Sequence, residues 1–288
     1  MLLSKFYSFE NYHVSAFNEY SAWFSKPYAF NDPFEGNYKL DLSDISIEHF
    51  ISIIFHDIDD AKLNPYHDFF KKVLIEQQVD KNTAIKILTP ILYDSTMKHK
   101  EDLINQMSIL VKSVQDAFKN SGVCCFFSGE TNRAINNPMM WGHYGNGLRG
   151  FAISFEPVDG SIFEEQNLSS LFVNYSNTPP TFSPLEIAVR FMSTSDSALK
   201  SELVKALLEI THTKGCHWVA EREFRFSCKE GNRLVKYKKG VMKSLYIGDK
   251  MDSWQKATLI SIAKNNGVEN IYTASTSHET YDIILKQI

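Results

Sequence analysis

A six-residue segment late in the chain, from Glu221 to Phe226, alternates charged and aromatic side chains. Successive side chains point to opposite faces of a β-strand, so its two phenylalanines are expected on one face. The other face would then carry Glu221, Glu223 and Arg225 in a row. Two neighbouring carboxylates can be pushed to different pKa values, with Arg225 holding one of them ionised, as acid–base chemistry requires. The alternative is a solvated strand face with a surface ion pair of little energetic consequence.

A second segment, Asn137 to Tyr144, combines helix-start signals with side chains that can bind a ring. Asn137 fits an N-cap and Pro138 the first helical position, which predicts a helix of two turns. Trp141 and Tyr144 could stack on a base or ring, and His143 could hydrogen-bond or move a proton. The alternative is that Trp141 and Tyr144 belong to the core.

Directly after this helix, Gly145 to Gly150 has the spacing G-x-G-x-x-G. In a dinucleotide-binding loop the glycines follow a strand and open a helix, so that phosphate meets the helix N-terminus. Here they follow a helical turn and open a predicted strand. We therefore reject the dinucleotide loop and expect a tight connection, with a nest of backbone N–H groups as the alternative.

The loop from Phe30 to Glu35 is the fourth candidate. Its asparagine and aspartate favour Asx turns, and the proline after them keeps the chain extended. Its two phenylalanines can pin the loop to the core, which would aim Asn31, Asp32 or Glu35 into a cleft.

The elements that must position these residues have an irregular order. Residues 45–120 show apolar side chains at helical spacing, in particular Ile47, Phe50, Ile51, Ile54 and Phe55, and again from Lys98 to Asn120, where Ser121-Gly122 gives a stop signal. Further helices are expected at Pro184–Phe191, Ser197–Thr211 and Ser253–Asn266. Short strands are expected at Leu2–Tyr7, Tyr20–Ser25, Val123–Ser128, Gly150–Phe155, Leu171–Tyr175, Glu221–Cys228 and Ser244–Ile247.

Without a steady strand–helix alternation, the pattern predicts an α+β fold with a mixed, mostly antiparallel sheet. We expect one domain over residues 1–288, with residues 45–120 as a large helical insertion that contributes no catalytic group.

Charge and composition narrow the classes of function. The 30 Lys and Arg against 34 Asp and Glu give a net charge of −4, which argues against general binding to nucleic-acid backbones. A basic run, residues 229–243, could meet phosphates, although a solvated hairpin is the better interpretation. The four cysteines form no C-x-x-C pair, and no metal-ligand spacing is present, so no metal site is expected. No apolar stretch approaches the length of a membrane span and no signal sequence is recognisable, which favours the cytoplasm and no membrane partner.

These motifs together resemble the bacterial domain-of-unknown-function 2971 family. The residues that carry the resemblance are Leu3–Tyr7, Trp23–Ser25, Phe30–Glu35, Phe126–Ser128, Met140–Tyr144, Arg149-Gly150, Lys214, Trp218, Glu221, Glu223 and Arg225. The family has no settled activity. The resemblance implies a bacterial protein, in some cases encoded near phage-defence genes, with a protein partner from a defence operon as one expectation.

The Glu-x-Glu element is also similar to that of ADP-ribosyltransferases, which suggests NAD as the substrate of a nucleotide- or nucleic-acid-acting enzyme. In that hypothesis Glu223 is the main catalytic carboxylate, assisted by Glu221, Arg225 and His143. The nucleotide would contact Lys5, Ser25, Asn31, Asp32, Ser128, Trp141 and Tyr144. Two alternatives remain: a non-catalytic sensor of a nucleotide or phage component, and a metal-free hydrolase in which a carboxylate activates water.

Overall fold

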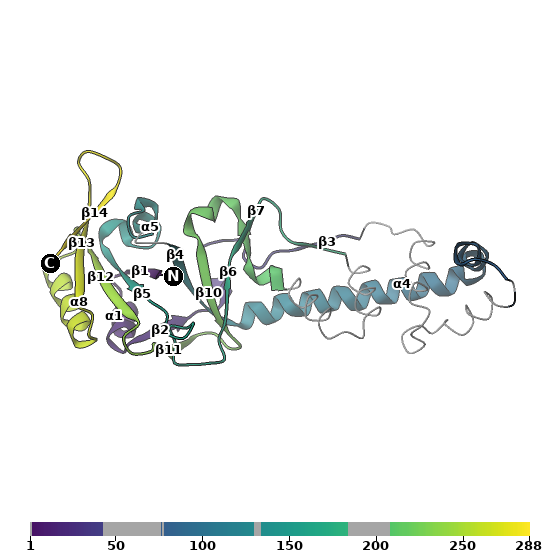
Figure 1. Cartoon of the computed structure of the whole chain (residues 1–288), viewed down its shortest axis with the longest axis horizontal. Coiled ribbons are helices and arrows are strands. Elements are labelled where there is room, and N and C mark those ends of the chain that lie inside the picture. The colour runs from purple at the N-terminus through teal and green to yellow at the C-terminus, as the bar shows by residue number, and fades with distance from the viewer. Residues whose placement is uncertain (1, 43–75, 77, 130–133, 184–207) are drawn as a thin grey trace. The chain divides into compact units, whose positions relative to one another are not determined.

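The structure is a computed structural model that describes residues 2–42, 76, 78–129, 134–183 and 208–288. The chain divides into two units (Figure 1). Unit 1 contains Met1–Glu35, Ala117–Asn177 and Lys214–Ile288, and unit 2 contains Gly36–Asp116 and Thr178–Thr213.

Within the described residues, unit 1 is built on an eight-stranded sheet with the order β14-β13-β12-β5-β1-β4-β10-β6. Its strands are β1 (Leu2–Ser8), β4 (Gly122–Gly129), β5 (Gly150–Phe155), β6 (Ser169–Phe172), β10 (Glu223–Cys228), β12 (Met242–Gly248), β13 (Asn270–Thr276) and β14 (Ile283–Gln287). Only β12 and β13 run parallel; the other neighbouring pairs are antiparallel. The predicted α+β class with a mostly antiparallel sheet is confirmed.

Both faces of the sheet are covered, and the central strand β5 is buried along its whole length. In β5, Phe151, Ile153 and Phe155 join the larger core on one face, whereas Ala152 joins a smaller core on the other. Side chains of helices α1 (Asn11–Asn18) and α8 (Ser253–Asn265) pack in the larger core, and those of α5 (Pro138–His143) in the smaller one. The predicted cap of α5 is confirmed, because the Asn137 side chain accepts a hydrogen bond from the Met139 N–H.

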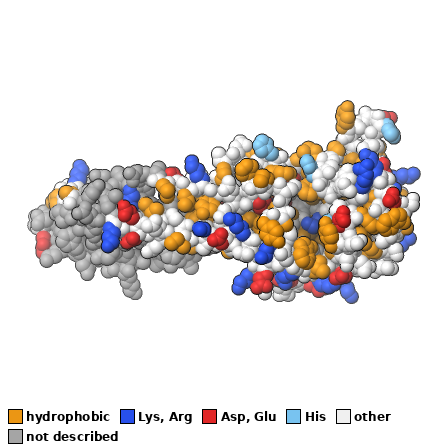
Figure 2. Space-filling model, turned by 180° about the vertical axis from the view of Figure 1, so that it is seen from behind, with side chains coloured by type: hydrophobic (Ala, Val, Ile, Leu, Met, Phe, Trp, Pro, Cys, Tyr) orange, Lys and Arg blue, Asp and Glu red, His pale blue; other side chains and the backbone are white. Residues whose placement is uncertain are grey.

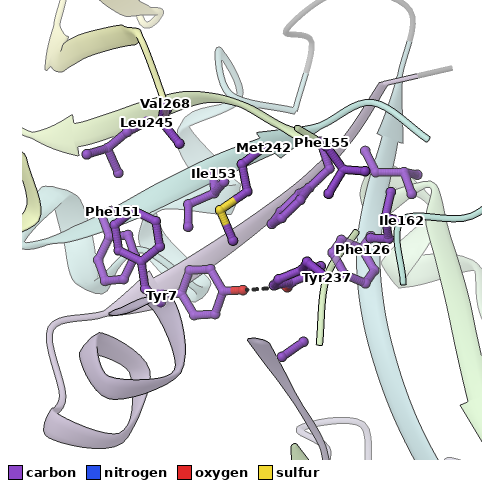
Figure 3. Close-up of a cluster of buried hydrophobic side chains, with 14 of the residues drawn as sticks. Tyr7, Phe126, Phe151, Ile153, Phe155, Ile162, Tyr237, Met242, Leu245 and Val268 are labelled. Carbon is purple, nitrogen blue, oxygen red and sulfur yellow. Dashed lines mark hydrogen bonds between the residues drawn. The ribbon is translucent and has the colours of Figure 1, made fainter. Parts of the chain in front are cut away.

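The larger core contains two buried tyrosines whose hydroxyl groups meet. Tyr7 and Tyr237 lie 3.4 Å apart, oxygen to oxygen, among apolar side chains (Figure 3). The Tyr237 ring stacks on the rings of Phe155 and Phe163. Burial raises the pKa of Tyr7 to about 12, so both hydroxyls can satisfy each other while they remain neutral.

Strands β1 and β4 diverge within the sheet. β1 pairs with β4 only through Leu2–Ser4, although it stays paired with β5 through Leu3–Ser8. The other end of β4 forms a bridge from Val123 to Ser25, directly after β2 (Ser21–Phe24). The divergence leaves an opening beside residues 5–8 of β1.

In unit 2 the described residues form a separate core of their own. Its buried members are Val111, Phe182 and Ile210, with Tyr38 and Leu40 packed against them. Strands β3 (Lys39–Leu40) and β8 (Thr181–Phe182) pair in parallel. The helix predicted at Lys98–Asn120 is confirmed but is longer, since α4 spans Lys81–Asn120.

Three expected helical segments cannot be compared with the structure. The stripe from Ile47 to Phe55, the helix at Pro184–Phe191 and most of the one at Ser197–Thr211 lie outside the described residues.

The backbone of β1 lies very close to Gly150, the first residue of β5. A Cβ atom at this position would lie 2.1 Å from the Tyr7 carbonyl oxygen, so Gly150→Ala must push β5 away from β1. We expect the free energy of unfolding to fall by about 1–3 kcal/mol in urea titrations. The control is Gly142→Ala in α5, where a Cβ meets nothing within 4 Å and stability should hold or rise by about 0.5–1 kcal/mol. Equal stability of the two variants would contradict the packing described.

Candidate functional site

A cleft of about 620 Å³ opens where β1 and β4 diverge. This volume is typical of small-molecule sites. The residues that line it all belong to unit 1. They are Lys5–Ser8 of β1, Glu10, His13, Trp23, Ser25, Ala29–Asn31, Val123, Cys125 and Phe127 of β4, Gly142–Tyr144, Asn146, Lys214, Glu221 and Glu223.

Glu221 and Glu223 reach the cleft from different elements. β10 begins only at Glu223; Glu221 ends the 3₁₀ helix η3 (Cys216–Glu221). Between them Arg222 has a left-handed backbone with φ of 45°, which breaks the strand. The prediction of a strand from Glu221 is therefore wrong, although that of a shared core face for Phe224 and Phe226 is confirmed.

Lys214 brings the two carboxylates together. Its Nζ lies 2.8 Å from Glu221 Oε2 and 3.3 Å from Glu223 Oε2. Lys214 belongs to β9 (Thr213–Gly215), which pairs with β7 (Asn174–Ser176). The hydroxyl of Tyr175 on β7 accepts a hydrogen bond from the Glu223 N–H at 2.8 Å, which fixes the start of β10.

Arg225 lies beneath the cleft and joins Glu223 to Glu35. Its Nε donates to Glu223 Oε1 at 2.8 Å, and its two terminal nitrogens reach the Glu35 oxygens at 2.6 and 3.0 Å. The side chain of Arg225 is 0% exposed, which overturns the alternative of a solvated surface ion pair. We call Glu35, Lys214, Glu221, Glu223 and Arg225 the ion-pair network.

Burial and pairing act against each other on the pKa values of this network. Burial disfavours the ionised form of Glu223, but Arg225 and Lys214 outweigh it and lower the pKa to about 2. At Glu35 burial prevails over the attraction of Arg225 and raises the pKa. Burial lowers the pKa of Lys214, yet Glu223 and Glu221 raise it further, so the ammonium stays charged. Glu223 is thus a permanently ionised carboxylate.

Tyr144 connects the network to the loop at residue 31. Its hydroxyl donates to Glu221 Oε1 and accepts a hydrogen bond from Asn31 Nδ2 at 3.0 Å. Burial, followed by the negative charge of Glu221, raises the pKa of Tyr144. The hydroxyl therefore remains a neutral donor at any physiological pH.

Of four other predicted residues, three line the cleft and one does not. Lys5 Nζ spans the opening and donates to the Cys125 carbonyl at 2.9 Å. His143 and Ser25 line the cleft. Ser128 does not; its hydroxyl donates to the Arg222 carbonyl at 2.6 Å.

Two residues that the sequence predicts to contact a ligand, Trp141 and Asp32, are buried. Trp141 is 1% exposed; its indole N–H donates to the Ile135 carbonyl at 2.7 Å and its ring meets Phe6 edge to face. The expectation that it stacks on a ligand is wrong, because the apolar ring fills the smaller core. Asp32 is also buried and accepts a hydrogen bond from the Phe34 N–H, as an Asx turn requires.

Sequence reasoning missed the roles of Lys214, Tyr175 and His13, and gave Glu35 only as one option. Lys214 and Tyr175 lie on strands too short to show a period. His13 lies in a helix in which no functional motif was recognised. The need for Glu35 becomes clear only in the structure, where the fully buried Arg225 requires a second carboxylate.

The basic run at residues 229–243 is largely engaged within unit 1. Arg233 pairs with Glu165 at 2.5 Å and Lys243 with Glu156 at 3.3 Å. Over the described residues of the face seen in Figure 2, basic side chains are interspersed with acidic ones. In the part of the chain that the structure describes, no helix has the length and apolarity of a membrane span, and no three His, Cys, Asp or Glu side chains are grouped to hold a metal ion.

Removal of the buried guanidinium should destabilise unit 1. In Arg225→Met, the buried Glu35 loses the guanidinium and Glu223 keeps only Lys214, so we expect a loss of about 3–5 kcal/mol in the free energy of unfolding. Arg233→Met is the matched control, because its pair with Glu165 is partly exposed, and should cost less than about 1 kcal/mol. Urea titrations of both variants at neutral pH measure the difference; equal losses would contradict the network.

The low pKa of Glu223 predicts a pH dependence. Its ordinary pKa is 4.5 and its folded pKa about 2, so its contribution to stability is full above about pH 4.5 and disappears as pH falls toward 2. Glu223→Gln should therefore be less stable than wild type at neutral pH, and the difference should shrink over that window. Glu165→Gln serves as the surface control with little difference at any pH. A gap for Glu223→Gln that is constant from pH 7 to pH 2.5 would disprove the assignment.

Comparison with known proteins gives one match. The model of a family described as "Protein of unknown function (DUF2971)" matches residues 140–226, a stretch that holds Tyr144 and most of the ion-pair network. No curated protein and no solved structure matches the chain. The earlier motifs, before residue 140, lie outside the matched range. Over residues 140–226 the chain thus resembles this family of unknown function, as its motifs predict.

Proposed function

We propose that the cleft binds NAD and that the protein is an enzyme of the ADP-ribosyltransferase type, with Glu221 as the carboxylate that contacts the nicotinamide ribose. The single observation that carries this proposal is a carboxylate held between a lysine and a tyrosine at the wall of an aromatic cleft.

Glu221 has capacity for a ligand hydroxyl. Each carboxylate oxygen accepts about two hydrogen bonds. Oε2 receives the ammonium of Lys214, and Oε1 receives the Tyr144 hydroxyl. A ribose hydroxyl can donate to Glu221 Oε1 beside Tyr144 or in its place. The Asn31 side chain is then near enough to the same ribose to accept or donate a further hydrogen bond.

Glu223 supports Glu221 rather than reacting itself. Its oxygens already receive Arg225 Nε at 2.8 Å, an Arg225 terminal nitrogen at 3.2 Å and Lys214 at 3.3 Å. Glu223 therefore has less capacity for a ligand than Glu221, which differs from the sequence-based hypothesis, in which Glu223 was the main catalytic carboxylate. In the proposal Glu223 is a positioning residue that orients Lys214, and through it Glu221.

Other side chains of the cleft suit the remaining parts of NAD. Trp23 is 46% exposed and lines the cleft with Phe30, so these rings can stack on nicotinamide or adenine in place of Trp141. The Lys5 ammonium donates to the Cys125 carbonyl and also interacts with the Cys124 side chain, and its positive charge suits a diphosphate.

The chemistry needs no further cofactor. The bond between the ribose carbon and the nicotinamide nitrogen breaks, and its electron pair neutralises the positive pyridinium ring. The ribosyl carbon becomes positively charged in the transition state. The carboxylate of Glu221, at the edge of the ion-pair network, stabilises that charge where it develops.

A second candidate, a nucleotide sensor without catalysis, is favoured by one observation. The carboxylates of the network are already paired, as expected of a rigid recognition site.

A role in phage defence rests only on the resemblance to the family and would be tested by infection of cells that carry the wild type or the variants below.

Glu221→Gln tests the reaction. It keeps the shape and the contact with Tyr144 but removes the charge, so release of nicotinamide from labelled NAD should fall by about 10²–10⁴-fold. Glu165→Gln is the control for a charge change on the surface of the same unit. Circular dichroism and urea titration check that both variants fold.

The outcomes separate the candidates. Release by wild type that is lost in Glu221→Gln supports the transferase. Saturable NAD binding by calorimetry without release supports the sensor. If wild type neither binds nor cleaves NAD, the transferase is wrong, and so is a sensor that recognises NAD.

A further inference from the structure

His13 is a histidine of the cleft that the ion-pair network does not use. It lies in the first turn of α1 and lines the cleft beside residues of β1. Its Nδ1 is 3.0 Å from the Ser8 carbonyl oxygen and 3.3 Å from the Ser8 hydroxyl. The ring meets Tyr7 edge to face, with centroids 5.2 Å apart, and lies 4.3 Å from the Tyr12 ring.

These contacts fix which ring nitrogen carries the proton. A carbonyl oxygen can only accept, so Nδ1 must be the protonated nitrogen and Nε2 keeps a free lone pair. Among the residues that the structure describes, none forms a hydrogen bond with Nε2. The chain thus holds the ring by one nitrogen and leaves the other one available.

The surroundings favour the neutral imidazole. Burial against Tyr7 and Tyr12 disfavours the charged form, and the ammonium of Lys5 repels it. The Ser8 carbonyl and the Glu10 carboxylate act in the opposite direction. The balance lowers the pKa of His13. The start of α1 adds the positive end of a helix dipole, as a base that must stay unprotonated requires.

We propose that His13 is the general base of the cleft, and that its Nε2 takes the proton from the water or hydroxyl group that attacks the ribosyl carbon of NAD. This inference rests on the proposed function. The O–H bond of the attacking group breaks as its oxygen bonds to the ribosyl carbon. The bond to nicotinamide breaks at the same carbon and neutral nicotinamide leaves. The imidazolium then returns its proton to solvent, so charge and atoms balance.

The division of labour follows from the geometry of one cleft. Glu221 already receives Lys214 and Tyr144 and is assigned the ribose hydroxyl and the positive charge, so the role of base is assigned to His13. His13 has an unprotonated nitrogen without a partner in the described residues and no anion bonded to it. The two side chains line the same cleft from η3 and α1.

Nuclear magnetic resonance of ¹⁵N-histidine-labelled protein tests this state without any substrate. His13→Gln assigns the signal. We expect the Nδ1–H tautomer, with a pKa below the ordinary value of a histidine. The Nε2–H tautomer, or an imidazolium at pH 7, would overturn the proposal whatever the fate of the NAD reaction.

Kinetics with labelled NAD test the role. His13→Gln should lower kcat by about 10²–10⁴-fold with KM little changed, and should abolish the fall in kcat that wild type shows as pH drops through the His13 pKa. His278→Gln is the control. In His13→Ala, added imidazole should restore part of the rate, which a merely structural histidine would not allow.

The results distinguish this inference from the proposed function. If wild type releases nicotinamide but His13→Gln does so at the wild-type rate with the same pH profile, the His13 assignment alone fails. If wild type releases none while Glu221-dependent binding persists, the reaction fails and the assignment with it.

Discussion

The site depends on one constraint, the burial of the Arg225 guanidinium. A charged group with five N–H donors has been taken out of water, and only acceptors of opposite charge can offset that cost. Glu223, two residues away on β10, supplies one carboxylate, and Glu35, 190 positions earlier in the chain, supplies the other. Fixing Glu35 also fixes the loop before it, and Asn31 of that loop reaches Tyr144. A single buried charge therefore holds distant segments of unit 1 in one arrangement.

Such a network is a costly way to gain stability. Replacing a buried ion pair by apolar side chains of similar volume is often neutral or stabilising, whereas removing one partner is strongly destabilising. Three carboxylates face two cations here, and burial raises the pKa of Glu35 in spite of its pairing with Arg225. A core designed only for stability would place an apolar residue at position 225, since Phe224 and Phe226 already anchor β10. The arrangement is better explained by what it holds at the cleft.

The sequence predicts the parts of this site that local rules control. Alternation in β10 correctly separates its phenylalanines from Arg225, and Asn137 correctly marks the start of α5. It fails at Glu221, because the left-handed turn at Arg222 follows from tertiary contacts. It fails at Trp141, because a short helix gives no reliable apolar face and the indole had a buried carbonyl to satisfy it. The cleft arises where β1 diverges from β4. The residues that pair in these two strands are more than a hundred positions apart, so their pairing leaves no periodic signal in the sequence.

The protonation states of the cleft are what favour a reaction over recognition alone. Paired cations keep Glu223 ionised, burial and Glu221 keep Tyr144 protonated, and burial and Lys5 favour the neutral form of His13. One cleft thus holds a fixed negative charge, a neutral donor and a neutral acceptor, each set by a different environment. A site that only recognises a nucleotide needs complementary donors, acceptors and charges, and a neutral imidazole nitrogen can serve there as an acceptor. The same nitrogen can also take a proton, which a fixed carboxylate paired with two cations does less readily. Separated protonation states of this kind are typical of acid–base catalysis.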